Sequence, residues 1–364
     1  MQLKIKITYV LIFFFILHNT HAQDEHFDDN LPINKIQTLG SHNSYKIMTE
    51  KCIHNLIKLA DPFYKKSLAP SKQMEYSHLP LDSQLQHYGL RNFELDIYRD
   101  TAGGRYYHRQ GMALCAKSTR SNVDALLWPG MKILHISDID FNTHYYTLKE
   151  ALRTVKNWSE QHPSHIPIYI LIETKEDGVS DHTKIAGFKT AIKFDYAGMM
   201  ELKKEIEDIF GENSKHLLKP DDVRKNLSTL NDAIQKIGFP KLQEARGKIV
   251  LIINGGQHIT SMLTDKHPSF MDLPYFSFAE PDRAESAFIK CDNPKNDLEK
   301  INYCVKKGYI VRTRADADTE EARKNDYSSF NIAKNSGAQL ISTDFYKPFL
   351  KTGYVLKREM LENK

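Results

Sequence analysis

Eight short runs of apolar and β-branched residues recur along the chain, and helix-like segments separate several of them. Runs of this length and composition are typical of buried strands. Strands joined through helices pair in parallel, because each connection crosses back to the other end of the sheet. We therefore predict an α/β fold in which eight strands close into a (β/α)8 TIM-like barrel. The predicted strands are Lys35–Leu39, Arg91–Tyr98, Lys132–Ile136, Ile166–Thr174, Lys248–Asn254, Tyr275–Phe278, Tyr309–Thr313 and Gln339–Thr343.

Two of the segments between these strands have clear helix boundaries. Leu148–Gln161 follows Thr147, and Glu150 stands three residues after that threonine, as in a capping box. A second helix is predicted over Glu320–Asn335, because Gly337 follows it as a C-cap signal. Both helices lie between predicted strands, as the barrel requires.

The N-terminus has the order of a secretory signal. Lys4 and Lys6 precede the apolar run Tyr9–Leu17, and the small residue Ala22 precedes a polar, acidic stretch. The run is too short to span a bilayer. We expect residues 1–22 to be a signal peptide, and the mature protein to be secreted, either to the extracellular space or to a periplasm.

The remaining residues, 23–364, are predicted to form a single catalytic domain. No internal repeat or low-complexity linker divides them, and the Lys/Glu-rich stretch Ile185–Phe239 is interpreted as an elaborated helical crossover. The formal charge of +4 is too small to indicate a nucleic-acid partner. We expect a monomer.

The four cysteines are predicted to form disulfides. The expected compartment is oxidising, and no C-x-x-C spacing indicates a metal site. Of the three pairings that four cysteines allow, we favour Cys291 with Cys304, which closes a short loop. This choice leaves Cys52 to pair with Cys115.

Acidic and amide side chains mark three of the predicted strands. Glu94 and Asp96 are two residues apart, so both project from the same face of one strand. Neighbouring carboxylates repel unless a cation or a shared proton compensates them. Asn43 and Glu173, at the ends of two other strands, complete an oxygen-only set that suits calcium or magnesium better than zinc. The alternative, structural ion pairs with arginines beside the strand, explains Glu94 and Asp96 but not this alignment.

Several motifs resemble, in order and spacing, those of the phosphoinositide-specific phospholipase C family. The catalytic half is similar at four segments, and two later segments look like the secreted bacterial calcium-dependent branch. The resemblance therefore spans nearly all of the expected mature chain. The segments are Ser41–Tyr45, Phe93–Ile97, Leu134-His135, Leu171–Glu173, Val311–Asp318 and Ser342–Phe345.

The resemblance implies a barrel of the phospholipase C-like phosphodiesterase type that acts on phosphoinositide lipids at a membrane surface. It would cleave phosphatidylinositol-type lipids to diacylglycerol and an inositol phosphate, through attack of the inositol 2-hydroxyl on phosphorus. The residues carried over are Asn43, Glu94, Asp96 and Glu173 as ligands of Ca2+, and His42 and His135 as the catalytic imidazoles.

The two histidines fit the proton transfers of this reaction. An imidazole with an unperturbed pKa of about 6.5 can donate a proton to the leaving alkoxide at ordinary pH. We assign that role to His135, whereas His42 would stabilise the pentavalent phosphorus or exchange proton roles with it. The base is left open between Glu173 and Glu94.

Three basic residues at or near strand ends are further candidates. Lys175 and Arg314 are predicted to bind the substrate, as fixed positive groups bind phosphate. Arg312 is placed similarly. For each of the three, the alternative is an ion pair of small energetic consequence.

Two assignments near the second histidine have alternatives. His108 follows the carboxylate strand closely, so it is the main alternative to His135. Asp138 and Asp140 could orient the His135 ring or cap the loop, and we leave both outside the catalytic set.

Two other functions are weighed against the phospholipase C. A glycerophosphodiester phosphodiesterase would also have a Glu-x-Asp strand, but His42-Asn43 replaces the His-Arg pair usual in that relative. A catalytically inactive barrel used as a binding protein would have lost a member of the set, and all members are present.

Overall fold

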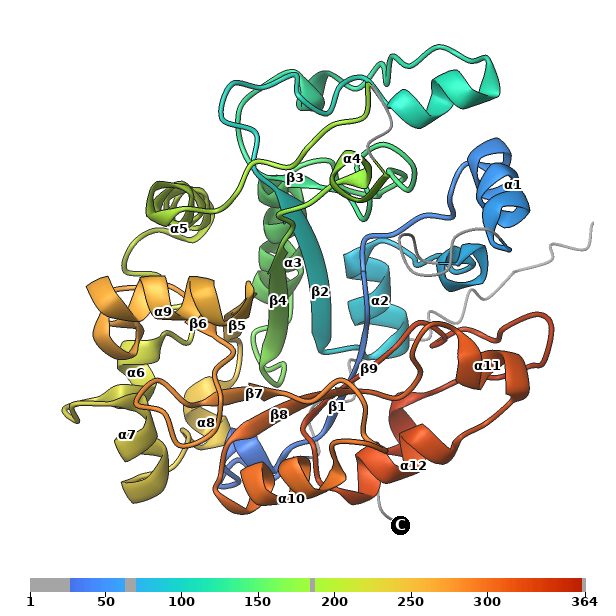
Figure 1. Cartoon of the computed structure of the whole chain (residues 1–364). Coiled ribbons are helices and arrows are strands. Elements are labelled where there is room, and N and C mark those ends of the chain that lie inside the picture. Colours follow the sequence, from blue (N-terminus) through green and yellow to red (C-terminus); the bar gives the residue numbers. More distant parts are fainter. Residues whose placement is uncertain (1–26, 63–69, 184–186, 362–364) are drawn as a thin grey trace, which may run out of the picture.

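A computed structural model of the chain describes residues 27–62, 70–183 and 187–361 (Figure 1). The predicted signal peptide lies outside these residues. No helix within them is both long enough and apolar enough to cross a membrane.

Eight parallel strands form the core of the described fold, in the order β6-β5-β4-β2-β1-β9-β8-β7. A parallel bridge between Phe278 and Phe288 links the two end strands, so the sheet nearly closes. The predicted TIM-like barrel is thus confirmed. The strands are β1 (Thr38–Ser41), β2 (Asn92–Tyr98), β4 (Ile168–Thr174), β5 (Ile249–Asn254), β6 (Phe276–Ser277), β7 (Phe288–Lys290), β8 (Ile310–Arg314) and β9 (Leu340–Thr343).

One predicted barrel strand is wrong, and one barrel strand was missed. The run Lys132–Ile136 contributes only β3 (Lys132–Ile133), which pairs antiparallel with the end of β2. At that end β2 still pairs with β4, but its pairing with β1 is confined to Asn92, so the other edge of Ile97 and Tyr98 is open to β3. The missing parallel strand is β7. Its three residues are too few to show a periodic signal.

The predicted helix after the third run is confirmed as α3 (Leu148–Gln161), with the Thr147–Glu150 capping box formed. The predicted helix Glu320–Asn335 is wrong as a single element. It divides into α11 (Glu320–Lys324) and α12 (Ser328–Asn335), because Asn325 adopts a left-handed conformation with φ of 52°.

Helices connect most consecutive barrel strands, but β6 passes to β7 without one and five described helices lie between β4 and β5. Besides α3, α11 and α12, the helices of the described residues are α1 (Lys51–Ala60), α2 (Leu81–Tyr88), α4 (Val179–Thr183), α5 (Tyr196–Phe210), α6 (Pro220–Arg224), α7 (Leu230–Lys236), α8 (Leu242–Ala245), α9 (Gly256–Lys266) and α10 (Leu298–Lys306). Short 3-10 turns are η2 (Ile33–Lys35), η3 (Ser71–Met74), η4 (Gln110–Cys115), η5 (Asp124–Leu126), η6 (Pro268–Phe270) and η7 (Arg358–Met360).

A second hydrophobic cluster lies beyond the carboxyl ends of β2 and β4, apart from the main barrel core. It joins Ile53 of α1, Leu126 of η5, Val179 of α4 and Leu134 of the segment after β3. Figure 1 shows α1, α4 and the long excursion after β2 gathered above these strand ends. This cluster supports the loop that carries His135.

The structure separates the two cysteine predictions. The disulfide between Cys52 and Cys115 is confirmed, with a Cα–Cα distance of 6.1 Å, and it ties α1 to η4. The predicted pairing of Cys291 with Cys304 is wrong, since both are free thiols. Each is buried in the main core as a small apolar side chain, and this burial raises their pKa values to about 12 and about 11.

Candidate active site

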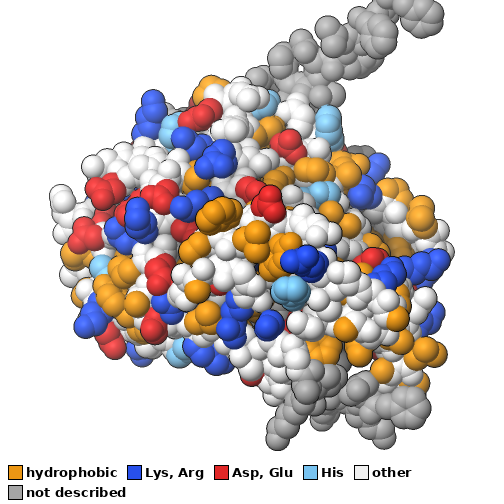
Figure 2. All heavy atoms as spheres, turned by 90° about the horizontal axis from the view of Figure 1, so that it is seen from above, with side chains coloured by type: hydrophobic (Ala, Val, Ile, Leu, Met, Phe, Trp, Pro, Cys, Tyr) orange, Lys and Arg blue, Asp and Glu red, His pale blue; other side chains and the backbone are white. Residues whose placement is uncertain are grey.

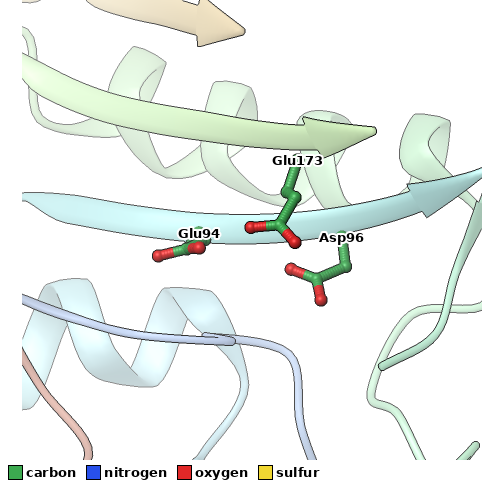
Figure 3. Close-up of side chains that lie close together, drawn as sticks. All are labelled: Glu94, Asp96 and Glu173. Carbon is green, nitrogen blue, oxygen red and sulfur yellow. The ribbon is translucent and has the colours of Figure 1, made fainter. Parts of the chain in front are cut away.

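Three carboxylates from two adjacent strands point toward one another inside the barrel (Figure 3). Glu94 and Asp96 share one face of β2, and Glu173 on β4 stands opposite Asp96 in the strand register. Oxygen atoms of all three lie within 4.8 Å of one another. The register between β2 and β4 therefore brings together three of the four predicted metal ligands.

Lys175 lies against two of these acids. Its Nζ is 3.3 Å from Oδ2 of Asp96 and 3.1 Å from Oε1 of Glu173. Burial raises the pKa of Asp96, which Lys175 only partly offsets. For Glu173, burial is outweighed by the ammonium groups of Lys175 and Lys290, and the pKa falls to about 2. One of the residues predicted to bind substrate therefore lies directly against the cluster.

Fixed donors also hold the outer oxygens of the two glutamates. Arg312 donates from Nη2 to Oε2 of Glu94 at 2.5 Å, and Asn254 donates from Nδ2 to Oε2 of Glu173 at 2.8 Å. Arg312 also pairs with Asp292. These contacts set the direction of each carboxylate, so the cluster is preorganised for a ligand.

The cluster fits a hard cation. In the described part of the chain, Oδ1 of the buried Asp96 has no hydrogen-bond partner. An unpaired carboxylate oxygen in the interior costs free energy unless a cation or a proton compensates it. Three carboxylates with no sulfur or imidazole ligand suit Ca2+.

Asn43 lies at the carboxyl end of β1 beside this cluster. The next residue, Ser44, bonds Glu94 twice, from its backbone amide to the Glu94 carbonyl at 2.9 Å and from the Glu94 amide to its hydroxyl at 2.8 Å. The Asn43 backbone is left-handed, with φ of 46°, and its Nδ2 donates to the Tyr76 hydroxyl at 2.8 Å. That bond occupies the amide nitrogen, whereas a cation would use the oxygen.

His42 is oriented by a buried carboxylate. Its Nδ1 lies 3.1 Å from Oδ1 of Asp344, just after β9, and Arg314 lies 3.5 Å from the other oxygen of that group. Although burial opposes ionisation, His42, His78 and Arg314 hold the pKa of Asp344 far below its usual value. Arg314, predicted to bind substrate, is therefore at the His42 side of the site.

His135 has a matching arrangement on the loop after β3. Its Nδ1 lies 2.7 Å from Oδ2 of Asp140, and the fully buried Lys46 places its Nζ 3.3 Å from the same oxygen. Burial lowers the pKa of His135, and Asp140 opposes this effect. Thr49 donates to the second Asp140 oxygen at 2.5 Å. Asp140 therefore orients the ring, a role that the sequence had left open.

The alternative residues near His135 have other partners. His108 is exposed, with Nδ1 3.0 Å from the Thr119 hydroxyl, in the excursion after β2. Asp138 accepts from the backbone amides of Gln110 and Lys189 at 3.0 and 2.7 Å, so it organises loops.

Sequence reasoning missed Asp344 as the partner of His42 and Arg312 as the partner of Glu94. The segment Ser342–Phe345 was noted only as a motif, and the β8 segment offered several basic residues. No local signal distinguishes them, because both contacts join residues more than two hundred positions apart.

A sequence model of the family of Ca2+-dependent phosphoinositide phospholipase C matches residues 31–359. The chain belongs to this family. The phospholipase C resemblance, the phosphodiesterase class and the calcium dependence expected from the sequence are thereby confirmed.

Solved structures of phospholipase C enzymes share the fold. A calcium-dependent phosphoinositol-specific phospholipase C from Pseudomonas sp is similar with a TM-score of 0.56 at 16% identity, over 89% of this chain and 94% of that one. A Ca2+-dependent enzyme from Streptomyces antibioticus has a TM-score of 0.50 at 14% identity, over 86% and 95%. No curated protein sequence matches this phospholipase C family member.

Proposed function

We propose that the protein is a secreted phospholipase C that cleaves phosphatidylinositol-type lipids by attack of the inositol 2-hydroxyl on the phosphate. The observation that carries the proposal is the acidic cluster of Glu94, Asp96 and Glu173, together with two histidines that each have a buried carboxylate partner. Phosphodiester cleavage needs a cation that stabilises charge on the phosphate and groups that transfer protons. A metal-binding cluster with two oriented imidazoles can supply both.

Asn43, Glu94, Asp96 and Glu173 would hold the Ca2+ ion. When bound, the ion neutralises charge on the phosphate and lowers the pKa of the attacking hydroxyl. The protein's own contribution is to keep these oxygens in place through Arg312, Lys175 and Asn254, as the contacts described above indicate. The burial of Glu94 and Asp96 also strengthens each charge interaction at the site.

His135 would donate a proton to the glycerol oxygen as the bond between that oxygen and phosphorus breaks. The proton of the 2-hydroxyl must leave as its oxygen bonds to phosphorus. We propose His42 as its acceptor, because Asp344 holds Nδ1 and leaves Nε2 for the substrate. The two glutamates considered from sequence are weaker candidates, since cationic or amide donors already bind their oxygens.

Lys175 and Arg314 would contact the substrate phosphate. Each already lies beside the proposed catalytic groups, Lys175 against the acidic cluster and Arg314 3.4 Å from Nδ1 of His42. A fixed cation in either place would attract the anionic headgroup and stabilise charge that develops on phosphate oxygens.

Export would place the enzyme where such lipids are exposed at a membrane surface. The lysine-apolar-small order of residues 1–22 supports a signal peptide, and the Cys52–Cys115 disulfide is typical of an oxidising compartment. We propose one catalytic domain that works as a monomer.

Turnover of phosphatidylinositol in the presence of Ca2+ or of a chelator tests the function. We expect diacylglycerol and an inositol phosphate as products, and loss of turnover in excess chelator. Full activity in chelator would contradict the calcium assignment. Cleavage of glycerophosphoinositol with no cleavage of the intact lipid would favour the glycerophosphodiesterase instead.

A further inference from the structure

Three large hydrophobic side chains are exposed around the disulfide. Leu56 and Leu59 on α1 are 36% and 72% exposed, and Leu114 on η4 is 56% exposed. Cys52, Leu56 and Leu59 are spaced by four and three residues, so they share one face of the helix. Because Cys52 bonds Cys115, Leu114 is held beside that face. The leucines therefore form one patch.

Basic side chains predominate around this patch, although Glu50 and Asp61 flank α1. Segments 51–60 and 109–120 contain no aspartate or glutamate, and Lys58, Lys117 and Arg120 are exposed. Glu50, just before α1, lies 3.8 Å from Lys117. We call the five residues Leu56, Leu59, Leu114, Lys117 and Arg120 the disulfide rim.

The rim is anchored to the loop that carries His135. Just before α1, Thr49 donates to Asp140, the partner of His135. At the start of η4, the amide of Gly111 donates to the carbonyl of Asp138 at 3.0 Å. Figure 2 views the molecule from above, the side toward which Figure 1 places α1, and shows hydrophobic side chains interspersed with charged side chains of both signs on that face. The rim thus stands at the same end of the barrel as the proposed active site.

We propose that the disulfide rim docks on the surface of an anionic phospholipid bilayer. This inference rests on the proposed function, because a substrate that stays in a bilayer requires the site to face it. Leucines would enter the headgroup boundary while lysine and arginine remain at the lipid phosphates. The disulfide keeps the two segments together before contact, so little ordering is needed on binding.

Binding to vesicles without inositol lipid separates docking from catalysis. The wild type should sediment with vesicles of phosphatidylcholine and phosphatidylserine, and Leu59→Ser or Leu114→Ser should each weaken partitioning about tenfold. The matched control is Ile237→Ser, which removes a side chain that is 54% exposed next to α7. In α7, Gln235 bonds the carbonyl of Lys307 before β8 begins, so the control lies at the other end of the barrel. Thermal unfolding midpoints check that each variant is folded.

A charge series tests the second half of the proposal. Lys117→Gln and Arg120→Gln should each reduce partitioning about fivefold, and added salt should weaken wild-type binding. The proposal is overturned if the leucine variants bind vesicles like the wild type, or if Ile237→Ser weakens partitioning as much as they do. It is also overturned if the rim substitutions instead abolish self-association in sedimentation velocity. Vesicle binding without lipid cleavage would reject the proposed function and leave the docking surface standing.

Discussion

Nδ1 of His135 lies 2.7 Å from Oδ2 of Asp140, five residues along the same loop, and the buried ammonium of Lys46 faces that carboxylate. This contact fixes the ring of the proposed general acid. It also makes Asp140 a positioning residue for that ring.

Asp140→Asn should lower kcat by about 10²- to 10⁴-fold. Asp140 opposes the burial that lowers the pKa of His135, so its loss should lower that pKa further. Because the acid must be protonated, the alkaline limb of the rate profile should move to lower pH. Asp138→Asn is the control, since its contacts are to backbone amides, and it should leave that limb in place.

His135→Ala should be nearly inactive on phosphatidylinositol and His108→Ala nearly unaffected. Loss of a proton donor costs about 10²- to 10⁴-fold, whereas His108 bonds only a surface threonine among the contacts described above. An aryl phosphodiester, whose leaving group needs no proton, should restore much of the His135→Ala rate. Rescue of His108→Ala instead would reassign the acid.

Asp96→Asn should weaken Ca2+ binding at least about tenfold, measured by calorimetry without substrate. The change keeps the size of the side chain but removes the charge of the acid whose Oδ1 lacks a partner. Asp100→Asn, at a carboxylate that accepts from the backbone of Gly103 and Arg105, should bind Ca2+ normally. Equal Ca2+ affinity in the wild type, Asp96→Asn and Asp100→Asn would place the metal elsewhere.

Unfolding without reductant should reveal two free thiols, at Cys291 and Cys304, and one disulfide between Cys52 and Cys115. The double variant Cys52→Ser, Cys115→Ser should lose roughly 2–4 kcal/mol of unfolding free energy. Peptide mapping and urea titration measure these outcomes. Protection of all four thiols would restore the pairing expected from the sequence.

Asp316 should make the stability depend on pH. Burial and nearby Asp344 raise its pKa from 3.8 to about 7, so between these values the folded state holds a proton that the unfolded state releases. Stability from this group is present at low pH and is lost as the pH rises through about 7. Asp316→Asn should therefore gain roughly 1–3 kcal/mol relative to the wild type between pH 5 and 8. Urea titrations at pH 5 and pH 8 measure the unfolding free energy of both proteins. The same pH dependence in the wild type and in Asp316→Asn would contradict this prediction.

Local patterns were sufficient to predict the strand and helix alternation and the shared face of Glu94 and Asp96. Side-chain direction repeats every two residues along a strand, so that pair needed no knowledge of the rest of the chain. The capping box of α3 likewise depends on only four consecutive residues, and the structure forms it where the sequence predicts it.

Other features depend on contacts that no local pattern encodes. A three-residue strand such as β7 forms because its neighbour β8 offers hydrogen bonds, and β3 pairs with the end of β2 because β1 pairs with β2 only at its start. Asp344 reaches His42 only because β9 lies beside β1. Cys291 and Cys304 stay reduced in a packed core, where sequence separation says nothing of which side chains surround them. Strand order and core packing are properties of the whole chain. They determine which residues contact one another, whereas the local sequence indicates only which residues are candidates for a site.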